Sequence, residues 1–284
     1  MKALFRQWAG EPCLEATRIS ANGSNRQYYR LVGASHRCMA AVNGDVRENE
    51  TFIYYAREMR ARGIRVPEVY AVSDDGTMYL QQDLGDVTLY GYLSGRRDRV
   101  EEMGEMYRRV IDDLIRIQRA CRDLDFSRAY PRADFDRQSI QWDLNYFKYY
   151  FLKLAYIPFD EQLLEDDYQR FIDYLLDEDC SYFLYRDFQA RNIMLHEGEL
   201  WYIDFQGGRR GAAQYDLASL LYSAKSELPD SLRMELLDYY VERCNSQFST
   251  LNSQFKSKFF GYVLVRMMQA MGAYGYRGFF EKKD

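Results

Sequence analysis

The sequence predicts an α+β fold, with a small antiparallel sheet and one helix at the start of the chain and a larger, mostly helical part after them. Three observations lead to this prediction. Of the 284 residues, 47% are hydrophobic, which is ample for the core of one large domain or two smaller ones. Up to about residue 90, short strand-like runs alternate with turn residues. After residue 90, apolar residues recur at helical spacing.

Turn residues divide the first 90 residues into short segments. Asn-Gly at 22–23, Asn-Gly-Asp at 43–45 and Asp-Asp-Gly at 74–76 are typical of tight turns. The run that follows the last of these turns is expected to be the second half of a hairpin. The strands predicted around these turns are residues 17–19, 27–32, 38–42, 69–73 and 78–82.

One helix is predicted between the third and fourth of these strands, from Arg47 to Arg62. Gly63 follows it as a C-terminal stop, and Pro67 lies beyond. The apolar residues at helical spacing that should face the sheet are Phe52, Tyr55, Ala56 and Met59.

The remainder of the chain is predicted to be mainly helical. Its helices are expected at residues 97–122, 135–156, 160–176, 231–247 and 255–274. We therefore predict a first domain of residues 1–84 and a second of residues 85–284, connected through the segment from Gln81 to Asp86.

Composition and charge exclude several classes of protein. A net charge of −5 argues against general nucleic-acid binding, and the chain has no run of 18 apolar residues that could span a membrane. The N-terminus lacks the apolar run of a signal peptide. Five widely separated cysteines, an odd number without a CxxC spacing, favour a reducing cytoplasm over a disulfide framework or a zinc site. Residues 160–179 carry nine carboxylates, which could be a solvated helix face or a surface for a cationic substrate.

The basic residues are unevenly divided between arginine and lysine. The chain has 30 Arg and 8 Lys, and no lysine occurs between Lys2 and Lys148. Any site in the first half of the chain that needs a cation must therefore use arginine.

Residues 182–206 lack the helical spacing of apolar residues that is found in the segments around them. Asp187 and Asn192 lie five residues apart, and two apolar runs follow, separated by Glu-Gly and ended by Asp204. This pattern predicts a hairpin. If the hairpin is symmetric about Gly198, Asn192 and Asp204 are cross-strand neighbours, about 5 Å apart.

Three oxygen-bearing side chains arranged in this way suit a hard cation. Mg²⁺ takes carboxylate and amide oxygens and completes its shell with phosphates and water. A nearby carboxylate can accept the proton of a hydroxyl nucleophile, so the set has the parts that phosphoryl transfer needs. The alternative is an ordinary surface hairpin with Asp and Asn at its turns.

The spacing Asp-x₄-Asn followed by Ile-Asp-Phe resembles the catalytic and metal-binding loops of the protein-kinase-like fold. YRDFQARNIML and WYIDFQGGRRGAAQYDLASLL are similar to segments of the aminoglycoside phosphotransferase family, and within it to bacterial kinases of N-acetylmuramate and other amino sugars. QQDLGD resembles the interlobe segment of that family, and GSNRQYYRL its nucleotide loop. The resemblance covers residues from about 5 to 275 and implies a bilobal kinase with a small N-terminal nucleotide-binding lobe.

The resemblance also implies roles for individual residues. Asp187 would be the catalytic base, and Asn192 and Asp204 would hold Mg²⁺. Asp216 would be the buried acid that braces the catalytic loop, although a helix N-cap is compatible with the same position. The segment from Gln82 to Leu84 would offer backbone groups to the adenine of ATP.

Contacts to substrate and phosphate are expected from residues beside the catalytic loop and on a helix. Arg186 and Arg191 flank the base, and each could touch phosphate or form a structural ion pair. Trp142 and Asp143 could hold a sugar by an aromatic face and a carboxylate, although packing of their helix is the alternative.

The sequence departs from the kinase pattern on its third strand, which carries no lysine for the nucleotide phosphates. The helix acid, Glu48 or Glu50, must then pair with an arginine. We expect Arg30 to take this role, with Arg26 as the next candidate and Ser24 in the same nucleotide loop. An arginine fork can bind phosphate, but with a geometry different from that of lysine.

These features predict an ATP- and Mg²⁺-dependent kinase of a sugar or amino sugar, with N-acetylmuramate and N-acetylglucosamine as candidates. An aminoglycoside kinase, a choline-like kinase and a catalytically silent nucleotide-binding module are the alternatives. The expected partner is a small-molecule sugar, with no nucleic acid and no membrane. Because the chain ends soon after a helix, a fused or separate C-terminal partner domain is also considered.

Overall fold

The computed structural model describes residues 1–19, 26–95, 99–223, 228–247 and 254–282. Ser24 lies outside these residues. The chain forms two compact units. The first unit comprises Met1–Gly95, Asp123–Pro131 and Ala190–Gly207, and the second comprises Arg96–Arg122, Arg132–Gln189 and Gly208–Asp284. These units differ in extent from the predicted domains, because the segment 190–207 groups with the N-terminal sheet rather than with the helices.

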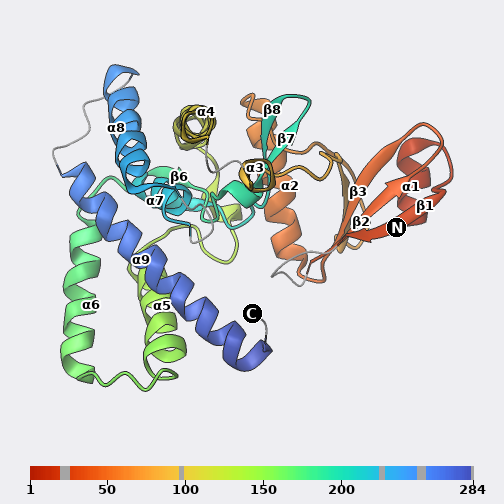
Figure 1. Cartoon of the computed structure of the whole chain (residues 1–284). Helices are drawn as coiled ribbons and strands as arrows, with labels where there is room; N and C mark the ends of the chain where they lie inside the picture. The colour runs from red at the N-terminus through yellow and green to blue at the C-terminus, as the bar shows by residue number, and fades with distance from the viewer. Residues whose placement is uncertain (20–25, 96–98, 224–227, 248–253, 283–284) are drawn as a thin grey trace. The chain divides into compact units, whose positions relative to one another are not determined.

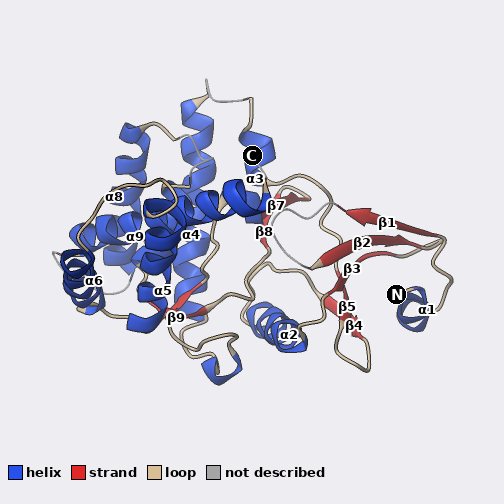
Figure 2. Ribbon diagram, turned by 90° about the horizontal axis from the view of Figure 1, so that it is seen from below, coloured by secondary structure: helices blue, strands red, loops and turns tan. Residues whose placement is uncertain are grey.

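The first unit contains a five-stranded antiparallel sheet in the order β1-β2-β3-β5-β4, seen in Figure 2. All five predicted strands are present, and their ends differ from the prediction by no more than two residues. Their bounds are β1 Glu15–Ile19, β2 Gln27–Val32, β3 Arg37–Val42, β4 Val69–Val72 and β5 Met78–Gln81.

Helix α2, Val46–Ala61, packs against β4 in the same unit. It begins because the side chain of its N-cap Asp45 accepts a hydrogen bond from the Glu48 N–H at 3.3 Å. Gly63 takes a left-handed φ of 73°, as the predicted stop requires. The ring of Phe52 stacks on Tyr79 of β5 at 4.8 Å, so the predicted apolar face is buried.

Two short helices of the first unit were not predicted. In α1, Lys2–Ala9, Phe5 is buried and Trp8 stacks on Tyr70 of β4 at 4.5 Å. The other is α3, Leu89–Leu93, which Thr88 caps by accepting from the Gly91 N–H. Both are too short to show a helical period in the sequence.

A separate hairpin of β7, Ile193–His196, and β8, Glu199–Tyr202, completes the first unit together with the 3₁₀ turns Phe126–Arg128 and Ala190–Asn192. The Leu195 N–H donates to the Val87 carbonyl at 2.8 Å, and this bond ties β7 to the chain just before α3.

The second unit is mainly helical. Its helices are α4 Val100–Ala120, α5 Arg137–Phe147, α6 Glu161–Leu176, α7 Gln214–Leu221, α8 Asp230–Gln247 and α9 Phe255–Tyr276. The short strands β6, Tyr182–Leu184, and β9, Arg209–Gly211, pair with each other, and neither these strands nor α7 were predicted. The predicted helix 135–156 is shorter than expected, since α5 passes into a π-helical turn at Lys148–Leu152. A second π-helical turn, Arg277–Glu281, follows α9.

Helix α9 runs across α5, as Figure 1 shows. Two glycines permit the close approach. A Cβ atom on Gly272 would lie 2.8 Å from the carbonyl of Tyr146, and one on Gly275 would lie 1.8 Å from that of Tyr150. No larger residue could occupy these positions without moving the two elements apart.

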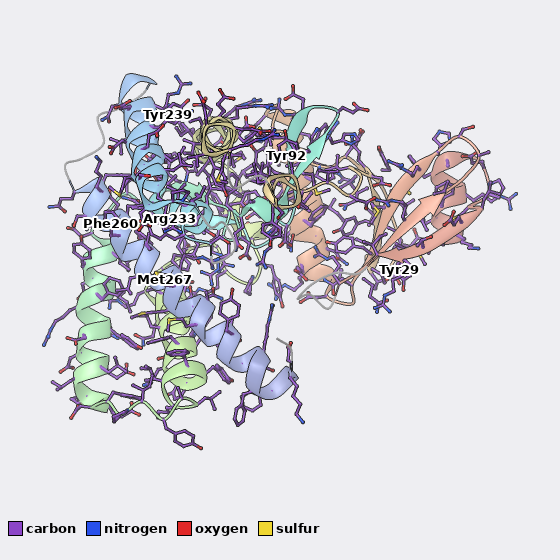
Figure 3. The ribbon with its side chains drawn as sticks, viewed as in Figure 1. Tyr29, Tyr92, Arg233, Tyr239, Phe260 and Met267 are labelled. Atoms are coloured by element: carbon purple, nitrogen blue, oxygen red, sulfur yellow. The ribbon has the colours of Figure 1, made fainter. Side chains whose placement is uncertain are left out.

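The opposite face of α9 leaves apolar side chains exposed. Phe260 and Met267, labelled in Figure 3, are 42% and 49% exposed. Even so, no helix within the described residues is both long enough and apolar enough to cross a membrane.

Two lysines of the second unit are buried and serve its structure. Lys258 donates to the carbonyls of Tyr174 and Asp177 and so satisfies the C-terminal end of α6. Lys148 forms ion pairs with Glu161 and Glu165. Some carboxylates of the acidic stretch 160–179 therefore form ion pairs with lysines of the same unit.

Candidate active site

Asn192 and Asp204 meet at the end of the β7–β8 hairpin in the first unit. The Asn192 Nδ2 donates to the Asp204 Oδ2 at 3.1 Å. The register differs from the predicted one, because His196 pairs with Glu199 across a two-residue turn. Asn192 therefore lies opposite Ile203, whose N–H donates to the Asn192 carbonyl at 3.1 Å. The left-handed φ of 68° at Asp204 takes this residue out of the strand, and its side chain still reaches Asn192.

The chemistry of this pair fits a magnesium ion. Its side chains offer hard oxygen donors, and Gln206 Nε2 donates to the Asp204 Oδ1 at 2.8 Å, which fixes the carboxylate. No group of three His, Cys, Asp or Glu side chains suited to a metal occurs within the described residues. A divalent ion held here would therefore need water or phosphate oxygens as further ligands, as Mg²⁺ commonly does. The metal role of both residues stays a prediction.

Arg26, and not Arg30, is the arginine that pairs with helix α2. Its Nη2 lies 3.3 Å from the Glu48 Oε1, and the residue is only 2% exposed. The guanidinium carbon lies 5.7 Å from the ring centre of Phe52 and 5.9 Å from that of Tyr79. Arg26 therefore brings a buried cation, from just before β2, to the acid of α2 for which the third strand has no lysine.

Arg30 makes a different set of contacts, which corrects its predicted pairing with the helix acid. Its Nε lies 2.7 Å from the Asp83 Oδ2 and its Nη2 lies 2.8 Å from the Asp86 Oδ1. Arg37 also reaches the Asp83 Oδ2, at 2.9 Å. The hydrogen bonds from Arg30 lower the pKa of Asp86. Arg30 thus ties β2 to the segment after β5, because these two aspartates hold its guanidinium.

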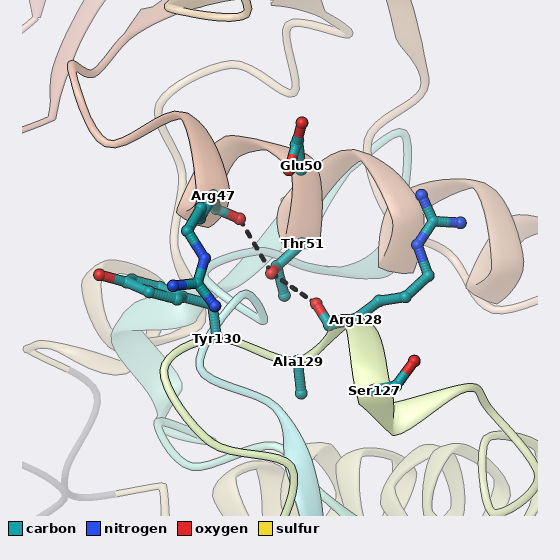
Figure 4. A pocket seen from close by; sticks show the side chains of 7 residues that line it. All are labelled: Arg47, Glu50, Thr51, Ser127, Arg128, Ala129 and Tyr130. Carbon is teal, nitrogen blue, oxygen red and sulfur yellow. Dashed lines mark hydrogen bonds between the residues drawn. The ribbon is translucent and has the colours of Figure 1, made fainter.

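Glu50 lies on another face of α2, which corrects its predicted role as the partner of an arginine near the nucleotide. It is two residues from Glu48, and such residues point to different sides of a helix. Glu50 lines a small cavity of about 170 Å³, shown in Figure 4. The cavity lies between α2 and the segment 127–130, which Thr51 joins by donating to the Arg128 carbonyl at 2.8 Å.

The segment from Gln82 to Leu84 has one backbone group already in use. The Gln82 N–H donates to the Glu68 carbonyl at 2.8 Å. Leu84 is buried, with 5% exposure. A nucleotide could take hydrogen bonds only from other backbone groups of this segment, and the adenine contact stays a prediction.

In the second unit, Asp216 holds the loop that carries Asp187. The carboxylate accepts the Tyr185 N–H at 2.6 Å and the Arg186 N–H at 3.0 Å. Asp216 lies in the first turn of α7, whose N-cap is Ala213, so the N-cap alternative is wrong. Burial raises the pKa of Asp216 to about 7, against the opposing effect of these two hydrogen bonds. The bracing contact that the resemblance implied is present.

Asp143 is occupied by an ion pair, which corrects its predicted contact with a sugar. Arg186 donates from Nη1 and Nη2 to its two carboxylate oxygens at 2.8 and 2.7 Å. Both side chains are largely buried, and the guanidinium lies over the rings of Phe135 and Tyr215. The structural alternative for Arg186 is therefore the right one.

The other two predicted substrate residues remain accessible. Trp142 is 48% exposed, with the Arg132 guanidinium 5.2 Å from its ring centre. Arg191 is exposed on the 3₁₀ turn directly before Asn192. Their contacts with substrate stay predictions.

The structure also places Arg266 of α9 beside the predicted base. Its Nη2 lies 3.7 Å from the Asp187 Oδ1. Sequence reasoning missed this residue. The available signal was a single arginine inside the apolar run VLVRMM of the last helix.

A family model described as the phosphotransferase enzyme family matches residues 15–246. The chain belongs to this family. It is similar to the N-acetylmuramate/N-acetylglucosamine kinase of Neisseria meningitidis, with 24% identity over 82% of this chain and 68% of the relative. The enzyme of the same name from Pseudomonas aeruginosa is 25% identical over 83% of this chain and 68% of the relative. As a member of the family, the chain is an enzyme that phosphorylates a small molecule.

Solved structures of kinases share the fold. A thermostable mutant of the aminoglycoside phosphotransferase APH(4)-Ia superposes with a TM-score of 0.62 and 16% identity over 99% of this chain and 94% of that chain. The choline kinase LicA from Streptococcus pneumoniae gives 0.60 and 14% over 100% and 92%. An ethanolamine kinase from Plasmodium vivax gives 0.66 and 12% over 94% and 77%. The predicted α+β, protein-kinase-like fold is confirmed.

Proposed function

We propose that this phosphotransferase uses ATP and Mg²⁺ to phosphorylate a hydroxyl group of an amino sugar. N-acetylmuramate and N-acetylglucosamine are the first candidates, because they are named for two relatives that align with more than four fifths of the chain. The observation that carries the proposal is the catalytic loop. Asp187 follows a backbone fixed by Asp216 and precedes by five residues the Asn192 that meets Asp204.

Asp187 is suited to act as the base. Its side chain is 42% exposed within the structure, so an acceptor hydroxyl can reach it. In the proposed reaction the carboxylate accepts the proton of that hydroxyl while the hydroxyl oxygen bonds to the γ-phosphorus of ATP. The bond from this phosphorus to the bridging oxygen of ADP breaks in the same displacement. The brace fixes the backbone just before Asp187 before substrate arrives, which reduces the reorganisation that the reaction requires.

Asn192 and Asp204 would hold the metal, and Arg26 would face the nucleotide phosphates. When bound, Mg²⁺ neutralises charge on the phosphates of ATP. Arg26 is held at one end by Glu48 and lies beside the stacked rings of Phe52 and Tyr79, so its cation is positioned without a lysine. A guanidinium fork can donate two parallel hydrogen bonds to a phosphate.

The test is ADP release with a panel of acceptors, measured with wild type and Asp187→Asn. The panel contains N-acetylmuramate, N-acetylglucosamine, an aminoglycoside and choline. We expect an amino sugar to stimulate Mg²⁺-dependent ADP release and Asp187→Asn to lower kcat by roughly 10³-fold, the scale of a lost proton-transfer residue. Asp238→Asn is the matched control, because Asp238 pairs with Lys256 on the helical surface. If no amino sugar is turned over, or if Asp187→Asn keeps wild-type kcat, the proposal is wrong.

One observation favours a choline-like acceptor as the second candidate. The rings of Tyr146, Tyr150 and Tyr276 have centres 4.8 to 6.3 Å apart, and Phe280 lies 5.3 Å from Tyr276. Aromatic faces of this kind attract quaternary ammonium groups. However, rings at these separations pack against one another, so choline would have to spread them. Turnover of choline with no response to amino sugars would favour this candidate.

A further inference from the structure

We propose that Arg266 is a positioning residue that orients the carboxylate of Asp187. The proposal rests on the proposed function, in which Asp187 is the base. Arg266 belongs to α9, about 80 residues beyond Asp187 in the chain, and would couple the last helix to the chemistry. It would act through Asp187 and without touching the reacting atoms.

The guanidinium of Arg266 is itself fixed from several sides. Its Nη1 lies 3.3 Å from the Tyr215 hydroxyl and 2.9 Å from the Gln269 Oε1. Its central carbon lies 5.5 Å from the centre of the Tyr215 ring, and the side chain is 11% exposed. Burial alone lowers the pKa of Arg266, but Tyr215 and Asp187 more than offset this effect and raise it. A charged, buried and tethered group of this kind can set the orientation of a neighbour.

The distance to Asp187 is compatible with a supporting role. At 3.7 Å, Arg266 Nη2 attracts the Asp187 Oδ1 but is too far away for a good hydrogen bond. The carboxylate is thus held by charge, and the contact does not use a short hydrogen bond that would compete with the acceptor hydroxyl.

The other charged groups around Asp187 in the second unit are already matched. Arg186 is bonded to Asp143 through both terminal nitrogens, and Asp216 accepts two backbone N–H groups. Among the residues that the structure describes, Asp187 is the carboxylate within ion-pair distance of Arg266. The geometry therefore connects Arg266 with the base, although its charge also acts on Asp216.

The test compares steady-state kinetics of Arg266→Gln, Arg266→Lys and Tyr215→Phe with those of wild type, using the amino sugar that wild type turns over. We expect Arg266→Gln to lower kcat by about 10- to 100-fold, with the KM for ATP and for the sugar within twofold. Arg266→Lys keeps the charge and should recover part of kcat. Tyr215→Phe removes one tether and should lower kcat less. Arg243→Gln is the matched control, since it removes an Arg–Asp pair between α8 and α4, with Nε 2.8 Å from the Asp112 Oδ1.

Chemical rescue separates positioning from a purely structural role. In Arg266→Ala, added methylguanidinium should restore part of kcat in a saturable way, without restoring activity to Asp187→Asn. Should Arg266→Gln fail to fold, as judged by circular dichroism, Arg266→Lys and Tyr215→Phe decide the question. The proposal is overturned if folded variants keep wild-type kcat, or if their loss lies entirely in the KM for the sugar, which would make Arg266 a substrate contact. If wild type turns over no acceptor, the proposed function fails instead.

Discussion

The two units use arginine–carboxylate pairs of different kinds. In the first unit, the Arg26 Nη2 and the Glu48 Oε1 lie 3.3 Å apart, and their side chains are 1% and 30% exposed. In the second unit, Arg186 and Asp143 form two hydrogen bonds at 2.8 and 2.7 Å, and the Asp143 side chain is 9% exposed. The bidentate pair leaves little room for a ligand, whereas the more exposed Glu48 can move to let one in.

The difference teaches that residue type does not decide the role of a charged pair. Both pairs looked like candidate ligand contacts in the sequence. Geometry and the exposure of the acid separate them. A bidentate pair with a buried acid is costly to open, whereas Glu48 is exposed enough to exchange partners at lower cost, with Arg26 itself remaining buried. The following changes test this distinction.

Breaking the Arg186–Asp143 pair should have the largest effect. Asp143→Ala leaves the buried Arg186 cation without its bidentate partner, so the free energy of unfolding should fall by about 3–5 kcal/mol. Urea denaturation, followed by circular dichroism, measures this loss. Asp143→Asn keeps one acceptor oxygen and should lose less. Equal stability of Asp143→Ala and wild type would show that the pair contributes nothing to the fold.

The brace at Asp216 should make stability depend on pH. Burial raises the pKa of Asp216 to about 7, above its ordinary 3.8, so between these values the folded state keeps a proton that the unfolded state has lost. This group therefore stabilises the fold fully below about pH 4, and its contribution to the free energy of unfolding, about 4 kcal/mol in total, is lost as pH rises through about 7. Asp216→Asn, which cannot ionise, should lack this decline in urea denaturation between pH 4 and 7. A variant with the wild-type slope would assign the decline to another group.

Much of the fold could be predicted because its elements carry local signals. The five strands stand between recognisable turns, and α2 has both an N-cap at Asp45 and a stop at Gly63. Helices α1, α3 and α7 were missed because they are short, and α7 is buried on every side, so it shows no amphipathic period. The approach of α9 to α5 depends on Gly272 and Gly275, whose function in packing is visible only once both helices are placed.

The candidate site was predictable where its parts are close in sequence. The meeting of Asn192 with Asp204 follows from a hairpin, although its register was misjudged by one position because the turn contains two residues. Partners distant in sequence could not be assigned. Arg186 finds Asp143 across 43 residues, and Arg30 finds Asp83 across 53. Long side chains can reach several acceptors, so only the three-dimensional arrangement decides between them.

Arg26 and Arg30 offer the finest test, since they lie four residues apart and bear the same charge. If the Arg26–Glu48 pair serves the nucleotide, Arg26→Gln should raise the KM for ATP by about tenfold or more, the scale of a charge-assisted hydrogen bond. Arg30→Gln should leave that KM within twofold and lower the free energy of unfolding by about 1–2 kcal/mol, because Asp83 and Asp86 lose a partner.

Isothermal titration calorimetry with a non-hydrolysable ATP analogue measures the nucleotide affinity of both variants, and so separates a loss of binding from a loss of stability. Arg26→Lys is the conservative control, because it keeps the cation but not the fork, and its KM for ATP should fall between wild type and Arg26→Gln. An Arg30→Gln variant that binds the nucleotide weakly while Arg26→Gln binds it normally would restore Arg30 as the phosphate contact. Such a result would mean that the Arg30–Asp83 pair separates when the nucleotide binds and that the Arg26–Glu48 pair is the structural one.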